Sequence, residues 1–295
     1  MKVLITGVTG LLGSQLARHY SQHGHEVWGL VHSTPVPSDL ARYLTQVRAP
    51  SELTGDFDLA INLAGASIAG GRWSAKRKQL LRDSRIGFTN SLLAPLSAAQ
   101  YRIDHLISGS AIGYYGSTTE TVTEQSSAGS DFSARMVADW EASALASQAH
   151  IDNITLIRTG LVLSNRGGLL KQLALPARLG LAARLGKGNQ GQSWVHEADW
   201  LAAVIWLQEQ RHTGAFNLTA PGPVSQDTFS RTLARQLHRP YWLKVPAAPL
   251  RLGMGELADL VLNGQWVIPA RLKEQGFNFA FPDLESALHD LFGAH

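Results

Sequence analysis

Cysteine is absent from the 295-residue chain, and charged residues are scarce. The lack of cysteine excludes disulfides, thiolate nucleophiles, iron–sulfur clusters and cysteine-ligated zinc. Asp, Glu, Lys and Arg together make up only 17% of the residues, and the formal net charge is +3. Charges this sparse and scattered indicate a solvated surface rather than a nucleic-acid-binding face. We therefore expect no nucleic-acid partner.

Long apolar runs are also missing. The longest stretch without a charged side chain, Ile86 to Tyr101, contains Pro95 and several polar residues, and it is too short to span a bilayer. The apolar start of the chain is interrupted by glycines and lacks the small-residue cleavage pattern of a signal peptide. We expect a cytoplasmic protein with no membrane partner. The sequence does not indicate its oligomeric state.

Two common kinds of catalytic site lack their signatures. The eleven histidines show no HExxH spacing, so we expect no metal site. The segment Ser108-Gly109-Ser110 does not supply the GxSxG turn of a serine hydrolase. The chain is nevertheless long enough to bury a large core, as one large domain or a domain with an appendage.

Short apolar runs alternate with helical patterns along the first half of the chain. This alternation predicts an α/β fold, a Rossmann-type doubly wound parallel sheet covered by helices on both faces. The predicted strands are Lys2–Thr6, Val27–Val31, Leu59–Leu63, His105–Ser108 and Ile154–Arg158. The predicted helices between them are Leu11–Gln22, Ala75–Leu93 and Ser133–Ser147.

The pattern changes after about Thr159. A glycine-rich segment over 166–192 predicts loops around a short helix, and helical segments follow from 225 onward. We expect residues 1–165 to form the dinucleotide-binding domain, with 193–224 returning to it. Residues 166–192 and 225–295 are expected to form a smaller, mainly helical lobe on the substrate side.

The first strand leads into a glycine-spaced turn at the opening of a helix. Gly7, Gly10 and Gly13 follow the spacing GxxGxxG, and Thr9, Leu11 and Leu12 lie between them. Such glycines permit a tight turn, let backbone amides approach a pyrophosphate, and let the helix lie close to the sheet. An ordinary strand–helix turn with packing glycines remains the alternative.

The end of the second strand bears on the choice of cofactor. NAD-binding sites place an acidic side chain there for the ribose hydroxyls, whereas this chain has Val31, His32 and Ser33. A 2′-phosphate would meet no like charge and could accept hydrogen bonds from His32 and Ser33. NADP(H) is therefore favoured over NAD(H), although the usual arginine is missing and a solvent-exposed histidine is the alternative.

Several motifs together resemble one family. GxTGxxG at Gly7–Gly13, INLAGASI at Ile61–Ile68, SGSAIGYYG at Ser108–Gly116 and LIRTGLVLS at Leu156–Ser164 resemble the extended short-chain dehydrogenase/reductase superfamily. WVHEAD at Trp194–Asp199 and the C-terminal residues are similar to its epimerase-type subfamily, which ends in a domain of unknown function. Members of that subfamily are sometimes labelled cell-division inhibitors.

The resemblance implies positions for further cofactor contacts. It places Leu63, Ala64 and Gly65 along the cofactor at the end of the third predicted strand, although Gly65 could also serve packing. It implies a cofactor contact for Arg85, for which a solvated helix position is the alternative. It also places Ser108 and Val162 on the cofactor side, Val162 at the nicotinamide end.

The usual catalytic set of the superfamily is incomplete here. Ser110 matches its serine, but Ser133 and Val137 stand where a YxxxK pair is expected. Tyr114 is the candidate acid, since the loop after the fourth predicted strand lies where ligands bind. Tyr114 and its neighbour Tyr115 could instead wall the pocket or fill the core.

Two other residues have both a chemical and a structural interpretation. Glu141 could pair with a cation or be solvated on a helix, and His196 could be a general base or make a fixed hydrogen bond. We therefore expect an NADP(H)-binding epimerase or oxidoreductase acting on an unknown small molecule by hydride transfer. A non-catalytic dinucleotide-binding regulator is the alternative, favoured by the loss of the YxxxK pair.

Overall fold

A computed structural model gives the three-dimensional structure, and it describes residues 1–31, 35–98 and 100–293. Its centre is a seven-stranded sheet in which every neighbouring pair is parallel. The doubly wound sheet expected from the sequence is confirmed. In spatial order its strands are β12 (Gly214–Leu218), β7 (Asn153–Thr159), β5 (Ile103–Ala111), β4 (Phe57–Asn62), β1 (Lys2–Thr6), β2 (Glu26–Leu30) and β3 (Thr45–Val47).

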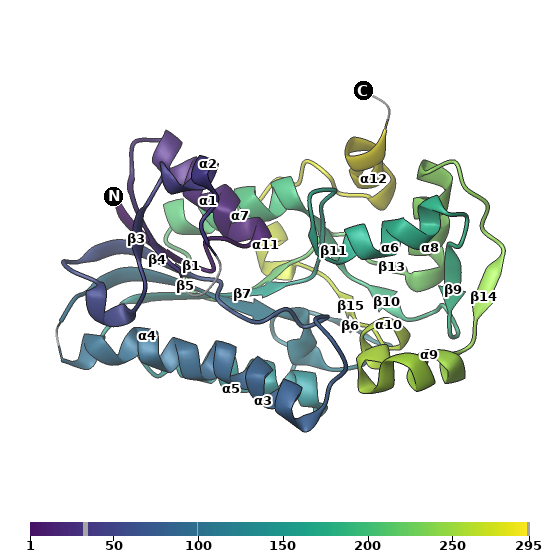
Figure 1. The fold of residues 1–295 in the computed structure, drawn as a ribbon, viewed down its shortest axis with the longest axis horizontal. Helices are drawn as coiled ribbons and strands as arrows, with labels where there is room; N and C mark the ends of the chain where they lie inside the picture. Colours follow the sequence, from purple (N-terminus) through teal and green to yellow (C-terminus); the bar gives the residue numbers. More distant parts are fainter. Residues whose placement is uncertain (32–34, 99, 294–295) are drawn as a thin grey trace.

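Helices cover both faces of the sheet (Figure 1). One face carries α1 (Leu11–Gln22), α2 (Ser38–Ala41) and α7 (Glu197–Glu209), and the other carries α3 (Ala75–Arg82), α4 (Phe88–Ser97) and α5 (Phe132–Leu145). Successive residues of a strand point to opposite faces. Val3 and Ile5 of β1 accordingly join the core under α1, whereas Leu4 joins the core under α4.

The predicted helix over Ala75–Leu93 is interrupted. Residues Asp83–Gly87 between α3 and α4 form one turn of π-helix. Such a turn widens the helix by one residue and is frequent at functional sites. Periodicity alone does not reveal it, because the apolar positions on either side still keep near-helical spacing.

The rest of the chain forms a smaller lobe with its own core. Leu170, Trp194, Phe229 and Leu288 are fully or almost fully buried in this core. The lobe contains α6 (Gly168–Arg178), α8 (Gln226–Gln236), α9 (Ala247–Met254), α10 (Asp259–Leu262) and α12 (Leu284–Phe292), with β9 (Ala183–Leu185) paired to β14 (Leu243–Val245). Three two-stranded pairs connect the lobe to the sheet. They are β8 (Leu161–Leu163) with β11 (Trp194–His196), β10 (Gly191–Gln192) with β13 (Val224–Ser225), and β6 (Thr121–Val122) with β15 (Trp266–Val267).

One C-terminal segment lies with the sheet although the sequence analysis grouped it with the lobe. Helix α11 (Ala270–Glu274) packs beside β12, and Leu272 is fully buried in the core under α1 and α7. Phe277 and Phe279 pack against the same core. Within the described ranges, the structure contains no helix long and apolar enough to cross a bilayer.

A histidine is buried within the central sheet. His105 of β5 has Nε2 2.8 Å from Oγ1 of Thr155, and the Thr155 hydroxyl donates to the carbonyl of His212. Because that hydroxyl hydrogen is already used, Nε2 carries the histidine proton. Nδ1 is buried without a hydrogen-bond partner among the described residues. Burial, together with the charge of Arg211, lowers the pKa of His105 to about 4.

We expect acid to destabilise the protein through this histidine. Its folded pKa lies below the ordinary value of 6.5, so the unfolded chain takes up the proton first as the pH falls. The free energy of unfolding should fall by about 3 kcal/mol between neutral pH and pH 4 on this account. Urea unfolding at several pH values measures the slope, and His105→Gln should flatten it. If the unaltered protein and the His105→Gln variant lose stability equally as the pH falls, His105 is not the cause of the acid sensitivity.

Candidate functional site

The predicted loop lies between β1 and α1 at the carboxyl edge of the sheet. Gly7 has φ of +67°, and a Cβ there would lie 2.7 Å from the carbonyl oxygen of Leu63. A Cβ on Gly13 would lie 2.3 Å from the carbonyl oxygen of Gly7. Backbone groups cannot move away as a flexible side chain can, so both positions require glycine. These two glycines hold the turn and the helix against the sheet.

Gly10 has a different role, because it begins the helix and is exposed. Its backbone is extended, with φ of −76° and ψ of 169°, and no side chain caps the helix. The first turn contains no acidic residue. The first N–H groups of a helix have no partner within the helix, and the helix dipole favours negative charge beside them. Leu11 and Leu12 therefore present backbone donors where a phosphate could bind.

A buried polar network fixes the adjacent end of β4. The Thr6 hydroxyl donates to Oδ1 of Asn62 at 2.7 Å and accepts from the backbone N–H groups of Leu63 and Ala64, each at 3.1 Å. Asn62 in turn donates to the Thr89 hydroxyl at 2.9 Å. The sequence analysis did not identify Thr6, Asn62 or Thr89. Polar side chains at the ends of two otherwise apolar strands were the available signal.

The π-helical turn faces this same edge. A Cβ on Gly65 would lie 3.1 Å from Cζ of Arg85, so the guanidinium lies directly against the strand end. Ser84 accepts a hydrogen bond from the N–H of Ala66 at 3.0 Å. Burial, with the charge of Arg77, lowers the pKa of Arg85 to about 10, so it remains a cation at neutral pH. Gly65 and Arg85 are thus brought together.

The other predicted cofactor residues are more dispersed. Ser108 of β5 is fully buried, and its hydroxyl has no hydrogen-bond partner among the residues the structure describes. Val31 is buried just past β2 and donates its N–H to Val47. Val162 lies half-buried in β8. His32 and Ser33, on which the cofactor preference depends, lie outside the described residues.

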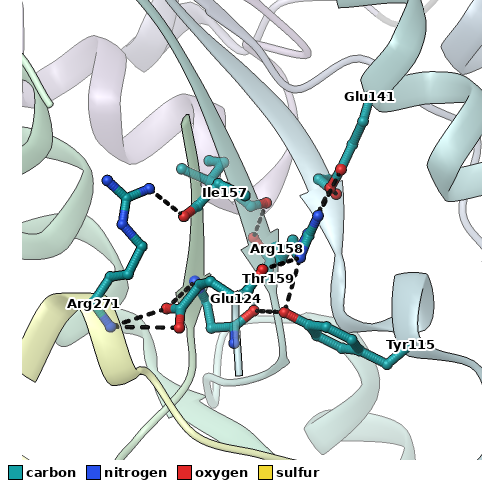
Figure 2. A network of polar contacts seen from close by, with 10 residues as sticks. Tyr115, Glu124, Glu141, Ile157, Arg158, Thr159 and Arg271 are labelled. Carbon is teal, nitrogen blue, oxygen red and sulfur yellow. Dashed lines mark hydrogen bonds and ion pairs between the residues drawn. The ribbon is translucent and has the colours of Figure 1, made fainter. Parts of the chain in front are cut away.

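Ser110 belongs to a buried ion-pair network (Figure 2). Its hydroxyl donates to Oε1 of Glu141 at 2.5 Å. Glu141 binds Arg158 through two parallel hydrogen bonds, Nε to Oε1 and Nη2 to Oε2, each of 2.8 Å. Both charged side chains are less than a tenth exposed. Burial lowers the pKa of Arg158, but its bonds to Glu141 and Tyr115 outweigh burial and raise it. The guanidinium therefore stays charged.

The network continues from Arg158 to the C-terminal part of the chain. Tyr115 accepts from Nη1 of Arg158 at 3.0 Å and donates to Oδ1 of Asn217 at 2.6 Å. The Glu124 carboxylate accepts from the backbone N–H groups of Asn217, at 3.0 Å, and Arg271. Burial raises the pKa of the Tyr115 phenol against the opposing effect of Arg158. These contacts join β7, β12 and α11, and Figure 2 shows those of Tyr115, Glu124, Arg158 and Arg271.

Tyr114, the candidate acid, lies next to this network without a hydrogen bond to it. Its ring is half-buried, and Cζ of Arg158 lies 3.5 Å from the ring centroid, in cation–π contact. Val137, at the place of the expected lysine, is buried with Leu81 and Met136, and Tyr114 packs against that cluster. Among the described residues, an arginine and not a lysine therefore lies beside the phenol ring of Tyr114.

His196 has a fixed structural role. It is the N-cap of α7, and its Nδ1 accepts from the N–H of Ala198 at 3.2 Å. Its Nε2 lies 3.3 Å from Oδ2 of Asp290, and its ring packs on Phe281. Burial lowers the pKa of His196 despite the nearby carboxylates, which suits a neutral capping ring. In the part of the chain that the structure describes, no cluster of histidine and acidic side chains could hold a metal ion.

The sheet order, the glycine turn after β1 and the open helix N-terminus define a Rossmann-type α/β protein. A sequence profile of the NAD dependent epimerase/dehydratase family matches residues 3–219, and a profile of a domain of unknown function, DUF1731, matches residues 245–291. The chain belongs to the NAD dependent epimerase/dehydratase family and carries a C-terminal DUF1731 domain.

Relatives cover nearly the whole chain. Epimerase family protein Mb2239 of Mycobacterium bovis is 38% identical over 291 residues, which are 97% of this chain and 96% of that protein. The structure is similar to that of human epimerase family protein SDR39U1, solved with NADPH, with a TM-score of 0.88, 28% identity and 99% of each chain covered. It is also similar to a nucleoside-diphosphate sugar epimerase from Corynebacterium glutamicum, with a TM-score of 0.76, 29% identity and 99% of this chain but 58% of that one covered.

Proposed function

We propose that this protein is an NADP(H)-binding, epimerase-like oxidoreductase that acts on an unknown small molecule. The observation that carries the proposal is the exposed, uncapped N-terminus of α1 at Gly10, beside the strand end held by Thr6 and Asn62. A pyrophosphate there would accept hydrogen bonds from the first N–H groups of the helix. Arg85 adds a cation next to Gly65. The human relative solved with NADPH supports the same cofactor class.

The preference for NADP(H) rests on charge at the end of β2. The strand ends at Leu30, and the following residues are Val31, His32 and Ser33, none of them acidic. A 2′-phosphate would therefore meet no repulsion there, and His32 and Ser33 offer donors. The related structure with NADPH agrees with this choice, whereas more distant neighbours of the same fold were solved with NAD.

We expect NADPH to bind about tenfold more tightly than NADH, as one charge-assisted hydrogen bond to the 2′-phosphate would give. The change in nicotinamide fluorescence on titration into the purified protein measures both dissociation constants. Replacing both His32 and Ser33 by alanine should remove the difference while leaving NADH binding unchanged. Equal affinity in the unaltered protein would refute the preference, and no binding of either cofactor would refute the proposal as a whole.

The cofactor, when bound, supplies a hydride at the nicotinamide ring. The chain would supply the proton and the substrate cleft. Tyr114 is the phenol we assign to proton transfer, with Ser110 and Arg158 as the polar groups behind it. We place the substrate between the sheet and the lobe formed by residues 166–192 and 225–295.

We expect Tyr114→Phe to lower turnover at least a hundredfold with little change in NADPH affinity, the usual scale for loss of a general acid. The measurement is oxidation of NADPH in a screen of carbonyl compounds and sugar nucleotides. Tyr115→Phe removes the neighbouring phenol hydroxyl, which bonds Arg158 and Asn217, and so tests whether loss of any hydroxyl at this place has the same effect. Undiminished turnover in the Tyr114 variant would remove Tyr114 from the reaction.

A non-catalytic regulator is a second candidate, and the packing around Val137 favours it. Val137 is 3% exposed and lies in an apolar cluster with Met136 and Leu81, where the superfamily has its lysine. Ser110 is bound to Glu141 and does not project an unpaired hydroxyl. NADPH binding with no turnover on any compound class would support the regulator.

A further inference from the structure

Basic residues are concentrated on the smaller lobe. Residues 166–192 and 225–295, which form the lobe, contain 12 lysines and arginines and 7 aspartates and glutamates, a net charge of +5. The rest of the chain holds 14 basic and 16 acidic residues, a net charge of −2. The positive net charge of the protein therefore comes from the lobe. A positively charged surface attracts anionic partners.

The same lobe exposes large apolar side chains. Five of the eight exposed large hydrophobic residues among the described ranges belong to it. Leu175 is 63% exposed, Leu179 71%, Leu181 49% and Trp242 68%. Single exposed leucines are ordinary, but several together on one surface indicate an interaction site.

The segments that carry these apolar residues are adjacent in space. Leu175 lies on the outer side of α6, opposite the buried Leu170, Ala174 and Ala177. β9 pairs in parallel with β14, with Ala183 beside Leu243, and Leu181 and Trp242 lie in the segments that lead into these two strands. The two segments also touch at Gly180 and Pro240, where a Cβ on the glycine would lie 3.7 Å from the proline ring.

Exposed cations surround this surface. Lys171 and Arg178 belong to α6, Lys244 to β14, and Arg239 lies just before that strand. None of these four forms an ion pair with an acidic side chain within the described part of the chain. We call the surface the lobe patch, and it consists of Lys171, Leu175, Arg178, Leu179, Leu181, Arg239, Trp242 and Lys244.

We propose that the lobe patch binds the surface of a bilayer that contains anionic lipids, which departs from the expectation of no membrane partner drawn from the sequence. Leucines and a tryptophan can enter the boundary between headgroups and acyl chains, while the surrounding cations contact the headgroups. Leucine side chains add nothing to phosphate recognition by a nucleic-acid-binding face, which uses rows of cations and stacked aromatic rings. The patch lies on α6, on β14 and on the segments just before β9 and β14, in the lobe, which is on the side of the molecule away from β3 in Figure 1.

The test is cosedimentation of the full chain with phosphatidylcholine vesicles, with and without an equal amount of phosphatidylglycerol. We expect binding to the anionic vesicles at low salt, weakening as salt rises. Arg239→Gln with Lys244→Gln should weaken it about 25-fold, from about fivefold for each cation. Leu179→Ser and Trp242→Ser should each weaken it about tenfold. Brominated lipid should quench tryptophan fluorescence less in Trp242→Phe than in the unaltered protein.

The control carries the same kinds of change on α3, below the sheet. Leu80 is 47% exposed, and Lys76 lies on the same helix. Lys76→Gln with Leu80→Ser should bind vesicles as the unaltered protein does. Urea unfolding of every variant verifies the fold. The proposal fails if the unaltered protein stays unbound, if it binds neutral vesicles equally, or if the lobe variants bind normally. Binding only to RNA or DNA, or a dimer that Trp242→Ser dissociates, would also overturn it.

Discussion

Glu141→Gln is expected to lower the free energy of unfolding by about 3–5 kcal/mol, because it leaves the buried Arg158 cation without its counter-charge. The pair joins α5 to β7, and Arg158 is only 4% exposed, so solvent cannot replace the lost carboxylate as its partner. Arg158→Met should cost a similar amount by leaving the Glu141 carboxylate with Ser110 alone. Urea unfolding at neutral pH measures both losses.

The double variant tests whether the two charges stabilise each other. Glu141→Gln combined with Arg158→Met leaves no buried charge at this place, so its loss should be well below the sum of the two single losses. The exposed pair of Arg82 and Asp139, with an N–O distance of 2.8 Å, is the matched control. Arg82→Met should cost less than about 1 kcal/mol. Additive losses at Glu141 and Arg158 would show that the two charges do not stabilise each other.

Gly10→Asp is expected to weaken NADPH binding by about three orders of magnitude. Two like charges about 4 Å apart repel by about 4 kcal/mol at an effective dielectric constant of about 20. The fold should survive, because Gly10 has the extended backbone of an N-cap and aspartate is a favoured N-cap residue. The helix is therefore expected to become slightly more stable while the cofactor is excluded. Nicotinamide fluorescence and thermal unfolding measure the two effects.

Two neutral substitutions distinguish charge from bulk. Gly10→Asn has nearly the same shape and the same capping ability without the charge, so its loss of affinity should be much smaller. Gly10→Ala adds only a Cβ, 3.1 Å from the carbonyl oxygen of Gly7. If the aspartate variant binds NADPH as tightly as the unaltered protein, the phosphate does not lie at this helix.

The sequence correctly predicted those elements whose structure is set by residues close together along the chain. The strand at Lys2–Thr6 and the helix at Leu11–Gln22 have the predicted bounds, because β-branched residues, glycines and helical spacing act within a few residues. The turn glycines were recognisable for the same reason. The short strand β3 was missed, since three residues carry too little pattern.

The buried network could not be predicted from local sequence, because its members are far apart along the chain. Arg158 meets Glu141 from another element, and Tyr115 meets Asn217 102 residues away. A signal was present in the strand Asn153–Thr159, where an arginine stands among buried apolar residues. A charge in such a strand requires a buried partner, but the sequence alone does not say which acid supplies it.

The C-terminal segment packs against the sheet, and this limits where the protein can be truncated. Arg271 donates to the carbonyl of Ala215 at 2.7 Å, and Asn217 donates to the carbonyl of Ile268 at 3.0 Å. The final sheet strand is thus completed by residues that lie beyond the epimerase/dehydratase match. A truncated protein ending at residue 219 would expose Phe216 and leave an unprotected edge prone to aggregation. We therefore expect the two matched regions to fold as one unit.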